Sequence, residues 1–355
     1  MGLIGGSFGL ALKRTGFGGT VVGVGRRATL DEAADLGVID EGWTYEEMDR
    51  ALRGADLVLL CTPIKRILEL LPEVGRHAEA GALVTDAGST KRRIVDEAAR
   101  ALPEGLHFVG GHPMAGSEKS GVAAADPFLF ENAIYILTPG EDVPGAPYAA
   151  LVELVRGIGS KVLEMDAAVH DRTVAAISHL PQLMATGLVE MVGRLHEEDG
   201  FFLTLAAGGF RDLTRIASSP YAPVWEDICH TNPDEIRGMI DRYIAQLTVL
   251  RDRVEAAELA RDFDYANRVR DGLPRDAKGF IHTLHELLVV AQDRPGIIAE
   301  MSAALAAGGI NINDIEVMKV REGEGGTIRL GFDSGEAAEG ALDVLTGLGY
   351  EARHR

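Results

Sequence analysis

Short apolar runs alternate with helical patterns from residue 5 to about residue 165. Strand followed by helix, repeated in this way, predicts a parallel sheet that helices cover on both faces. The runs that we assign to strands read "GTVVGVG", "ADLVLLCTP", "GALVTDAG", "LHFVGGHP", "NAIYILTP" and "KVLEMD". Residues 1–165 are therefore expected to form a doubly wound, Rossmann-like α/β domain.

The pattern changes near Asp166, where apolar residues begin to recur at helical spacing. They are Val169, Val174, Ile177, Leu180, Met184, Leu188, Met191 and Leu195. Helical patterns continue to about Arg270 without a convincing strand, which predicts an all-helical domain over residues 166–275. The polar, turn-rich segment "NRVRDGLPRDAKG" is interpreted as a linker.

A third pattern follows the linker. A strand, a turn with Pro295 and Gly296, a helix, the pair Gly308-Gly309, two strands, a helix and a last strand succeed one another. This order predicts a small βαββαβ sandwich over residues 283–355 that folds as its own domain.

Composition limits the kind of protein. A chain of 355 residues, 46% hydrophobic and 25% charged, is ordinary for a globular protein of two or three domains. No apolar run is long enough to span a membrane and no signal peptide is recognised, so we expect a cytoplasmic protein without a membrane partner. Cys61 and Cys229 are too few for a disulfide framework or a cysteine metal cluster, and we expect no metal ion. The net charge of −19 argues against nucleic acid.

The first residues, "MGLIGGSFGLALKRTG", are typical of a glycine-rich dinucleotide turn entering its helix. Backbone groups of Gly2, Leu3, Ile4 and Gly5 are the expected contacts of a pyrophosphate. Such a turn normally follows a buried strand, so we expect that the start was assigned at an internal methionine and that the first strand and first glycine are missing. An ordinary capped surface helix is the alternative.

Cofactor choice is expected to depend on the end of the second strand. In such folds an acidic residue there binds the adenine ribose, but "VVGVGRR" has Gly25 followed by Arg26 and Arg27. Two guanidinium groups suit a 2′-phosphate, so NADP is favoured over NAD, with a solvated basic turn as the alternative. Thr62 and Pro63, after the next strand, are further expected cofactor contacts.

Two polar residues are expected at the carboxyl edge of the sheet, where doubly wound folds bind ligands. Ser89 in "TDAGSTK" follows a strand and begins a helix. Its hydroxyl either contacts a ligand at this edge or is simply the N-cap of the helix. His112 in "FVGGHPMAGSEKSG" is a candidate base near neutral pH, although a lone histidine is more often structural.

Candidate substrate contacts lie in the helical domain. His179 and Gln182 are three residues apart and share a helix face, with Pro181 interrupting the backbone ladder between them. Arg211 and Arg215, four apart beside two glycines, could present two guanidinium groups to carboxylates. Core packing for the first pair, and salt bridges to acidic neighbours such as Asp212 or Glu226 for the second, are the alternatives.

In this order, the segments "GLIGGS", "DAGSTK", "GGHPMAGSEKSG", "HDRTVAAISHLP" and "GGFRDLTRIA" resemble the prephenate/arogenate dehydrogenase family, and "DRPGIIAEMSAALAAGGINI" resembles an ACT domain. The resemblance implies oxidative decarboxylation of prephenate to 4-hydroxyphenylpyruvate, or of arogenate to tyrosine, with hydride transfer to NAD(P). It implies that His112 draws the proton from the ring hydroxyl, that Ser89 orients His112 and the cofactor, and that Arg215 holds a carboxylate.

The resemblance also implies regulation and assembly. Tyrosine is the expected feedback ligand, bound near Asp293, Pro295, Gly296 and Asn311, and a homodimer is expected. Family members that use prephenate often have a second histidine where this chain has Gln182, which leaves prephenate and arogenate both open as substrates. A β-hydroxyacid dehydrogenase, which needs a catalytic lysine in the helical domain, and a non-catalytic amino-acid and nucleotide sensor are the rival interpretations.

Overall fold

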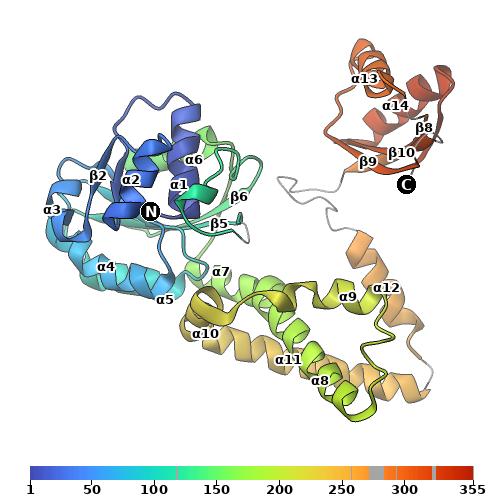
Figure 1. Cartoon of the computed structure of the whole chain (residues 1–355), viewed down its shortest axis with the longest axis horizontal. Helices are drawn as coiled ribbons and strands as arrows, with labels where there is room; N and C mark the ends of the chain where they lie inside the picture. Colours follow the sequence, from blue (N-terminus) through green and yellow to red (C-terminus); the bar gives the residue numbers. More distant parts are fainter. Residues whose placement is uncertain (117–118, 257, 272–283, 293, 322–324, 355) are drawn as a thin grey trace. The chain divides into compact units, whose positions relative to one another are not determined.

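The computed structural model describes residues 1–116, 119–256, 258–271, 284–292, 294–321 and 325–354 (Figure 1). The chain divides into two compact units, Met1–Ala257 and Glu258–Arg355. The first unit contains an α/β part followed by a helical part, and the second contains one helix and a small α/β sandwich.

The α/β part contains two separate sheets. Strand β1 pairs in parallel with β2, and a five-stranded sheet has the order β3-β4-β5-β6-β7. The strands are β1 (Val22–Val24), β2 (Glu41–Trp43), β3 (Leu57–Leu60), β4 (Leu83–Asp86), β5 (His107–Pro113), β6 (Ile134–Pro139) and β7 (Lys161–Glu164). The helices are α1 (Leu3–Arg14), α2 (Arg27–Asp35), α3 (Met48–Ala51), α4 (Ile64–His77), α5 (Arg92–Ala101) and α6 (Gly145–Gly157).

Helices cover both faces of the larger sheet, as predicted. On one face Ile67 and Leu71 of α4 pack with Val84 of β4, and on the other Phe8 of α1 packs in the cluster that contains Val109 of β5. All six predicted strands are present, and β2 was not predicted.

One strand corrects the expectation of an all-parallel sheet. Strand β6 runs antiparallel to β5, whereas β3, β4 and β5 are parallel to one another and β6 is parallel to β7. A parallel neighbour requires a crossover connection, usually through a helix. Between β5 and β6 the described residues contain only the 3-10 turn Val122–Ala124, so the chain reverses direction there.

The helical part is all-helical throughout its described residues, as predicted. It comprises α7 (Ala167–Val174), the π turn η3 (Ala175–His179), α8 (Leu180–Asp199), α9 (Gly208–Thr214), the 3-10 turn η4 (Arg215–Ser218), the π turn η5 (Tyr221–Trp225), α10 (Glu226–Thr231) and α11 (Pro233–Ala256). The carboxylate of Asp166 caps α7 by accepting from the backbone N–H of Ala168 at 2.7 Å. The π turn ends at His179, just before Leu180 and Pro181, where the sequence predicted an interrupted ladder.

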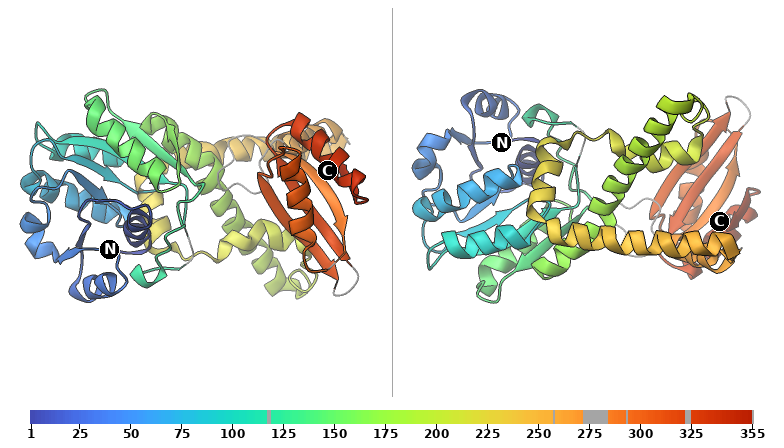
Figure 2. Two further views of the ribbon diagram at one scale, coloured as in Figure 1. Left: turned by 90° about the horizontal axis from the view of Figure 1, so that it is seen from above. Right: turned by 90° about the horizontal axis from the view of Figure 1, so that it is seen from below.

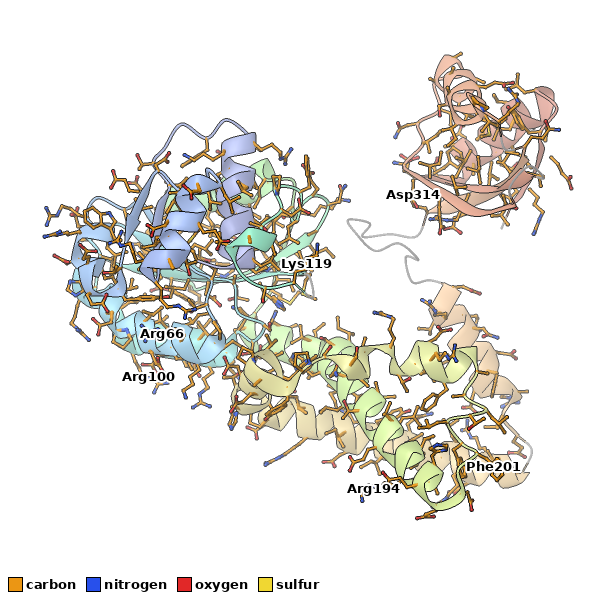
Figure 3. The ribbon with its side chains drawn as sticks, in the orientation of Figure 1. Arg66, Arg100, Lys119, Arg194, Phe201 and Asp314 are labelled. Atoms are coloured by element: carbon orange, nitrogen blue, oxygen red, sulfur yellow. The ribbon has the colours of Figure 1, made fainter. Side chains whose placement is uncertain are left out.

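Many large apolar side chains of the helical part are exposed. The predicted apolar stripe is only partly buried: Val174 is in the core, whereas Ile177 and Met191 are more than half exposed. Figure 3 shows Phe201, also exposed, just beyond the end of α8. Further exposed members are Val189, Leu195, Phe202, Leu203, Leu205, Leu213, Tyr221, Val224, Ile244, Leu247, Val249 and Val254.

The second unit contains the predicted βαββαβ sandwich. Its elements are β8 (His285–Ala291), α13 (Ile297–Ala307), β9 (Asp314–Arg321), β10 (Gly325–Phe332), α14 (Gly335–Gly347) and β11 (Glu351–His354). The antiparallel sheet has the order β11-β8-β10-β9, and α13 and α14 cover one face (Figure 2). Helix α12 (Ala260–Asp271) corrects the predicted linker, since residues 267–271 are helical.

Candidate active site

A cavity of about 310 Å³ lies where the end of β5 meets the helical part. Parallel strands present their carboxyl ends to ligands, so this is the edge at which a doubly wound sheet is expected to bind. The lining residues are Ser89, His112, Pro113, Met114, Ala115, Gly116, Val174, Ser178, His179, Val224, Trp225 and Ile228. The fold therefore brings together Ser89, His112 and His179, three of the predicted site residues.

His112 is held by a second histidine. Its Nδ1 lies 2.8 Å from Nε2 of His170, and the two rings meet edge to face with centroids 5.1 Å apart. Burial holds the pKa of His112 well below its usual 6.5, and the neighbouring His170 and Lys91 lower it further. The ring is therefore neutral at neutral pH, which is the form that accepts a proton.

A buried ion pair lies next to the strand that carries His112. Nζ of Lys91 donates to Oδ2 of Asp86 and, at 2.6 Å, to the backbone oxygen of Gly111. Oδ1 of Asp86 accepts from the backbone N–H of Gly111 at 3.0 Å. Burial lowers the pKa of Lys91 and the charge of Asp86 opposes that shift. The pair fixes the backbone immediately before His112.

Asp171 joins the two parts of the first unit. Its carboxylate accepts from the backbone N–H groups of Lys91 at 2.7 Å and of Arg92 at 3.0 Å, and so caps α5 from α7. It also lies 2.8 Å from Nδ1 of His170, while Asn232 donates to its backbone oxygen at 2.8 Å. The helix N-terminus attracts this negative charge. His170, Asp171, Lys91 and Asp86 were not predicted from the sequence; the "HD" pair within a predicted helix was the available signal.

His179 and Gln182 are both buried at the junction of η3 and α8. His179 packs edge to face on Trp225 with ring centroids 6.1 Å apart, and its Nδ1 has no hydrogen-bond partner among the described residues. Burial lowers the pKa of His179 to about 4, against the opposing charge of Asp171. Gln182 follows one turn later but does not line the cavity.

Ser89 lies in the loop before α5 rather than at its first turn. The helix begins at Arg92 with Lys91 as its N-cap, so the predicted start was three residues early. The cause is the carboxylate of Asp171, which caps the helix from outside the segment. Ser89 thus lies at the cavity wall, while the described hydrogen bond of His112 runs to His170.

Arg211 and Arg215 are exposed and are not among the cavity residues. Arg211 lies on α9 and Arg215 begins η4, and Figure 1 shows α9 along the helical part, apart from β5. Within the described residues neither arginine forms an ion pair, so the salt bridges to Asp212 or Glu226 are not observed. Their guanidinium groups are available to an anion.

The start of α1 fits a dinucleotide pyrophosphate. Gly2 is its N-cap, the first turn has no acidic residue, and a Cβ at Gly2 would meet nothing within 4 Å, which leaves room for a phosphate. Leu3 and Ile4 form the first turn. A Cβ at Gly5 would lie 2.3 Å from Sγ of Cys61, so Gly5 is required for close packing of helix on strand.

The arginines after β1 differ from expectation in one respect. Arg27 is 3.3 Å from Oε2 of Glu47, so a carboxylate lies at a site predicted to have none. The reason is β2, which pairs with β1 and brings the following turn beside it. Arg26 is exposed.

Two further predicted cofactor contacts follow β3. Thr62 is half-buried, and Pro63 is the N-cap of α4. Both therefore lie at the carboxyl end of a parallel strand, on the side where such folds bind their ligands.

The predicted regulatory residues occupy the start of α13 and the turn after it. Gly296 is the N-cap of α13 with φ of 88°, a left-handed conformation that favours glycine. Pro295 precedes it, and Asn311 is exposed between α13 and β9. Asp293 lies outside the described residues.

Candidate metal sites and membrane-spanning helices are both absent from the described residues. Across the described ranges, the structure contains no group of three or more His, Cys, Asp or Glu side chains arranged to hold a metal ion. None of the helices in those ranges is long and apolar enough to cross a membrane.

Three family models match consecutive parts of the chain. Residues 8–164 match the prephenate dehydrogenase nucleotide-binding domain, residues 166–266 the prephenate dehydrogenase dimerization domain, and residues 285–340 the ACT domain. Together they span both compact units.

Known prephenate and arogenate dehydrogenases are similar to this chain over most of its length. Prephenate dehydrogenase of Bacillus subtilis is 42% identical over 341 residues, which are 94% of this chain and 91% of the relative. The structure resembles A. aeolicus prephenate dehydrogenase in complex with hydroxyphenyl propionate and NAD+, with a TM-score of 0.69 at 31% identity over 76% of this chain and 93% of that one. Synechocystis arogenate dehydrogenase gives a TM-score of 0.68 at 31% identity over 76% and 96%.

Proposed function

The chain belongs to the prephenate dehydrogenase family, NAD-dependent enzymes of tyrosine biosynthesis, and we propose that it converts prephenate to 4-hydroxyphenylpyruvate with His112 as general base. The observation that carries the proposal is the position of His112 in the cavity wall, with Nδ1 hydrogen-bonded to His170 and the ring neutral. A neutral imidazole that hydrogen-bonds through one nitrogen has the other available for a substrate proton.

In the proposed reaction, His112 takes the proton from the ring hydroxyl of prephenate as a hydride leaves the ring carbon that bears this hydroxyl. A nicotinamide bound at this edge would supply the hydride acceptor, and carbon dioxide would leave as the ring becomes aromatic. Backbone N–H groups of Gly2, Leu3, Ile4 and Gly5 at the start of α1 would hold the pyrophosphate, with Thr62 and Pro63 beside it. Ser89 at the cavity wall would contact both substrate and nicotinamide.

The two arginines after β1 bear on the choice between NADP and NAD. We favour NADP because Arg26 is exposed after β1 and a guanidinium suits a 2′-phosphate. Glu47 beside Arg27 opposes that preference, since its carboxylate already holds one of the two guanidinium groups. NAD, which the A. aeolicus enzyme binds in its complex with hydroxyphenyl propionate, is the competing cofactor.

Substrate recognition is proposed to use His179 and Gln182 with Arg211 and Arg215. The exposed arginines would supply the positive charge that a dicarboxylate requires in a chain of net charge −19. Arogenate is the alternative substrate, because the neutral amide of Gln182 can hydrogen-bond an amino group. Comparing kcat/KM for prephenate and arogenate in wild type and in Gln182→His tests this, since an unchanged ratio would place Gln182 outside specificity.

Assembly and regulation complete the proposal. The exposed apolar side chains of the helical part, in the region that matches a dimerization domain, support a homodimer. The residues Pro295, Gly296 and Asn311, with Asp293, are proposed to bind tyrosine as an inhibitor. Tyrosine that neither inhibits nor raises the melting temperature would contradict this. Free Cys61 and Cys229 suit the reducing cytoplasm, where we propose that the enzyme works.

The decisive experiment replaces the base. His112→Asn should keep the fold and the KM for prephenate while kcat falls by about 10²–10⁴, the usual contribution of a general base. Reduction of cofactor by prephenate, followed at the nicotinamide absorbance band, measures kcat, and His77→Gln at the end of α4 is a control. Turnover near that of the wild type would transfer the role of base to another group.

A further inference from the structure

A line of three side chains connects His112 to a buried carboxylate on α7. Nδ1 of His112 lies 2.8 Å from Nε2 of His170, and Nδ1 of His170 lies 2.8 Å from Oδ1 of Asp171. His170 and Asp171 are fully buried. In catalytic triads, a carboxylate hydrogen-bonds the imidazole that acts as base and so orients it toward the reacting group. Here a second imidazole, that of His170, lies between the carboxylate and the base.

The proton positions in this line follow from what each group can accept. Both oxygens of Asp171 accept backbone N–H groups, of Lys91 and Arg92, so the carboxylate acts as an acceptor. Nδ1 of His170 must then carry its proton and donate, which makes Nε2 of His170 an acceptor. His112 can meet that acceptor only with a proton on its own Nδ1.

We propose that His170 and Asp171 are positioning residues that fix His112 in the tautomer protonated on Nδ1, so that Nε2 is free to accept the substrate proton. The inference rests on the proposed role of His112 and assigns work to two residues outside the cavity lining. The orientation of the base is thereby set by the helical part, although His112 itself belongs to β5.

The same line stabilises the charge that forms during turnover. When Nε2 of His112 takes the hydroxyl proton, the ring becomes an imidazolium, and its Nδ1 proton strengthens the hydrogen bond to His170. Five charged or titratable groups lie near His112. Asp86 ends β4 and Lys91 is the N-cap of α5, whereas His179 lies on η3 and His170 and Asp171 lie on α7. Lys91 and Asp86 neutralise each other, so Asp171 is the carboxylate that balances the imidazolium.

Asp171 also caps α5 and is therefore a poor residue with which to separate positioning from folding. Among the residues that the structure describes, His170 makes side-chain hydrogen bonds only to His112 and Asp171. Replacing His170 breaks the line while the cap on α5 remains, so His170 is the residue to test.

The first experiment measures the tautomer directly. The full chain is labelled with ¹⁵N-histidine, and long-range ¹H–¹⁵N NMR spectra identify the protonated nitrogen of each of the 10 histidines. Loss of one set of signals in His112→Asn assigns His112. We expect a protonated Nδ1 and an unprotonated Nε2 at neutral pH. A proton on Nε2 in the wild type would overturn the proposal without any measurement of turnover.

The second experiment breaks and partly restores the line. His170→Phe removes both hydrogen bonds, so we expect kcat to fall about 10²-fold with the KM for prephenate changed little and with mixed tautomers of His112. His170→Gln retains a hydrogen-bond acceptor, its Oε1, so its kcat should be at least about tenfold higher than that of His170→Phe. His77→Gln serves as the matched surface control.

Two outcomes of this second experiment contradict the proposal: turnover of His170→Phe equal to the wild type, or His170→Phe and His170→Gln equally slow. Equal slowing would mean that packing, rather than the hydrogen bond, is what His170 provides. If His170→Phe does not fold, the tautomer measured in the wild type decides. Full activity of His112→Asn would instead refute the proposed function, so the two failures are distinguishable.

Discussion

Lys91 in the first compact unit and Arg329 in the second are both buried cations, yet their surroundings differ. Lys91 binds Asp86, which is fully buried, close to two histidines and a cavity. Arg329 on β10 binds three carboxylates of neighbouring strands, Glu286 at 2.8 Å, Asp314 at 2.7 Å and Glu316 at 2.9 Å. Figure 3 shows Asp314 within the C-terminal unit.

The difference separates a charge cluster beside the candidate active site from one that lies within the C-terminal sheet. Arginine does not lose its proton in proteins, and its three partners retain side-chain exposures of 14%, 24% and 49%. That cluster can join strands β8, β9 and β10 but cannot transfer a proton. The Lys91 cluster adjoins histidines with lowered pKa values at the wall of a cavity. A buried charge marks an active site when groups beside it can change their protonation.

Removing Lys91 should have the largest effect. Lys91→Met leaves Asp86 charged and fully buried, and breaking a buried pair from one side typically costs about 3–5 kcal/mol. Calorimetric unfolding should show this loss in the transition of the N-terminal unit, with the C-terminal transition unchanged as internal control. The double variant Asp86→Asn with Lys91→Met should recover part of the loss. Equal stability of Lys91→Met and the wild type would mean that Asp86 is not charged.

The pH dependence of stability tests the histidines of the same cluster. The folded protein holds the pKa of His179 at about 4, below the unfolded value of 6.5, so the unfolded chain binds this proton first. The free energy of unfolding should therefore fall as pH falls from 6.5 to 4, by about 3 kcal/mol for this residue. His112, with its pKa also lowered, adds to the loss in the same direction.

The measurement compares denaturant unfolding of the N-terminal unit in wild type and His179→Asn from pH 7.5 to 4. Carboxylates protonate in both proteins, so the difference between the two curves isolates His179. Parallel curves would show that His179 is not buried as a neutral ring. For turnover, the acid limb of kcat/KM should lie below pH 6.5, because burial lowers the pKa of His112.

Arg329 should matter less than Lys91, because the carboxylates left behind can rehydrate. We expect Arg329→Met to destabilise the C-terminal unit by about 2 kcal/mol, the size of a hydrogen-bonded charge contact, with kcat unchanged. Calorimetry of Arg329→Met beside Arg353→Met, an exposed arginine on β11, checks this. If Arg329→Met lost more free energy of unfolding than Lys91→Met, the Arg329 cluster would be the more stabilising of the two, against our expectation.

Strands were predictable where an apolar run was long enough to signal burial, as in "ADLVLLCTP". Strand β2 was missed because "EGW" has no such run and forms only by pairing with β1. The reversal at β6 was missed for a related reason, since strand direction depends on the connection rather than on the strand itself. Long-range pairing is not encoded in the local pattern.

The candidate base His112 was predictable because it follows a strand and two glycines, whereas the residues that contact it were not. His170 and Asp171 lie in a helix whose pattern does not tell which polar residues face inward. Asp171 is recognisable as a cap only after α5 is seen to begin beside it. The carboxylate near Arg27 was likewise hidden, because Glu47 is 20 residues away in sequence.

The exposed pair Arg27 and Glu47 extends the comparison to the surface, and there the smallest effect is expected. Surface ion pairs contribute about 0–1 kcal/mol, so Arg27→Ala should change stability little. Arg26→Ala should raise the KM for NADP about tenfold, the lower range of a charge-assisted contact, and leave the KM for NAD unchanged. Glu47→Gln frees Arg27 and should lower the KM for NADP, since the carboxylate no longer competes with the 2′-phosphate. Denaturant unfolding measures the stability of Arg27→Ala, and steady-state assays with both cofactors measure the KM values of Arg26→Ala and Glu47→Gln. Equal changes for NAD and NADP would separate these arginines from cofactor choice.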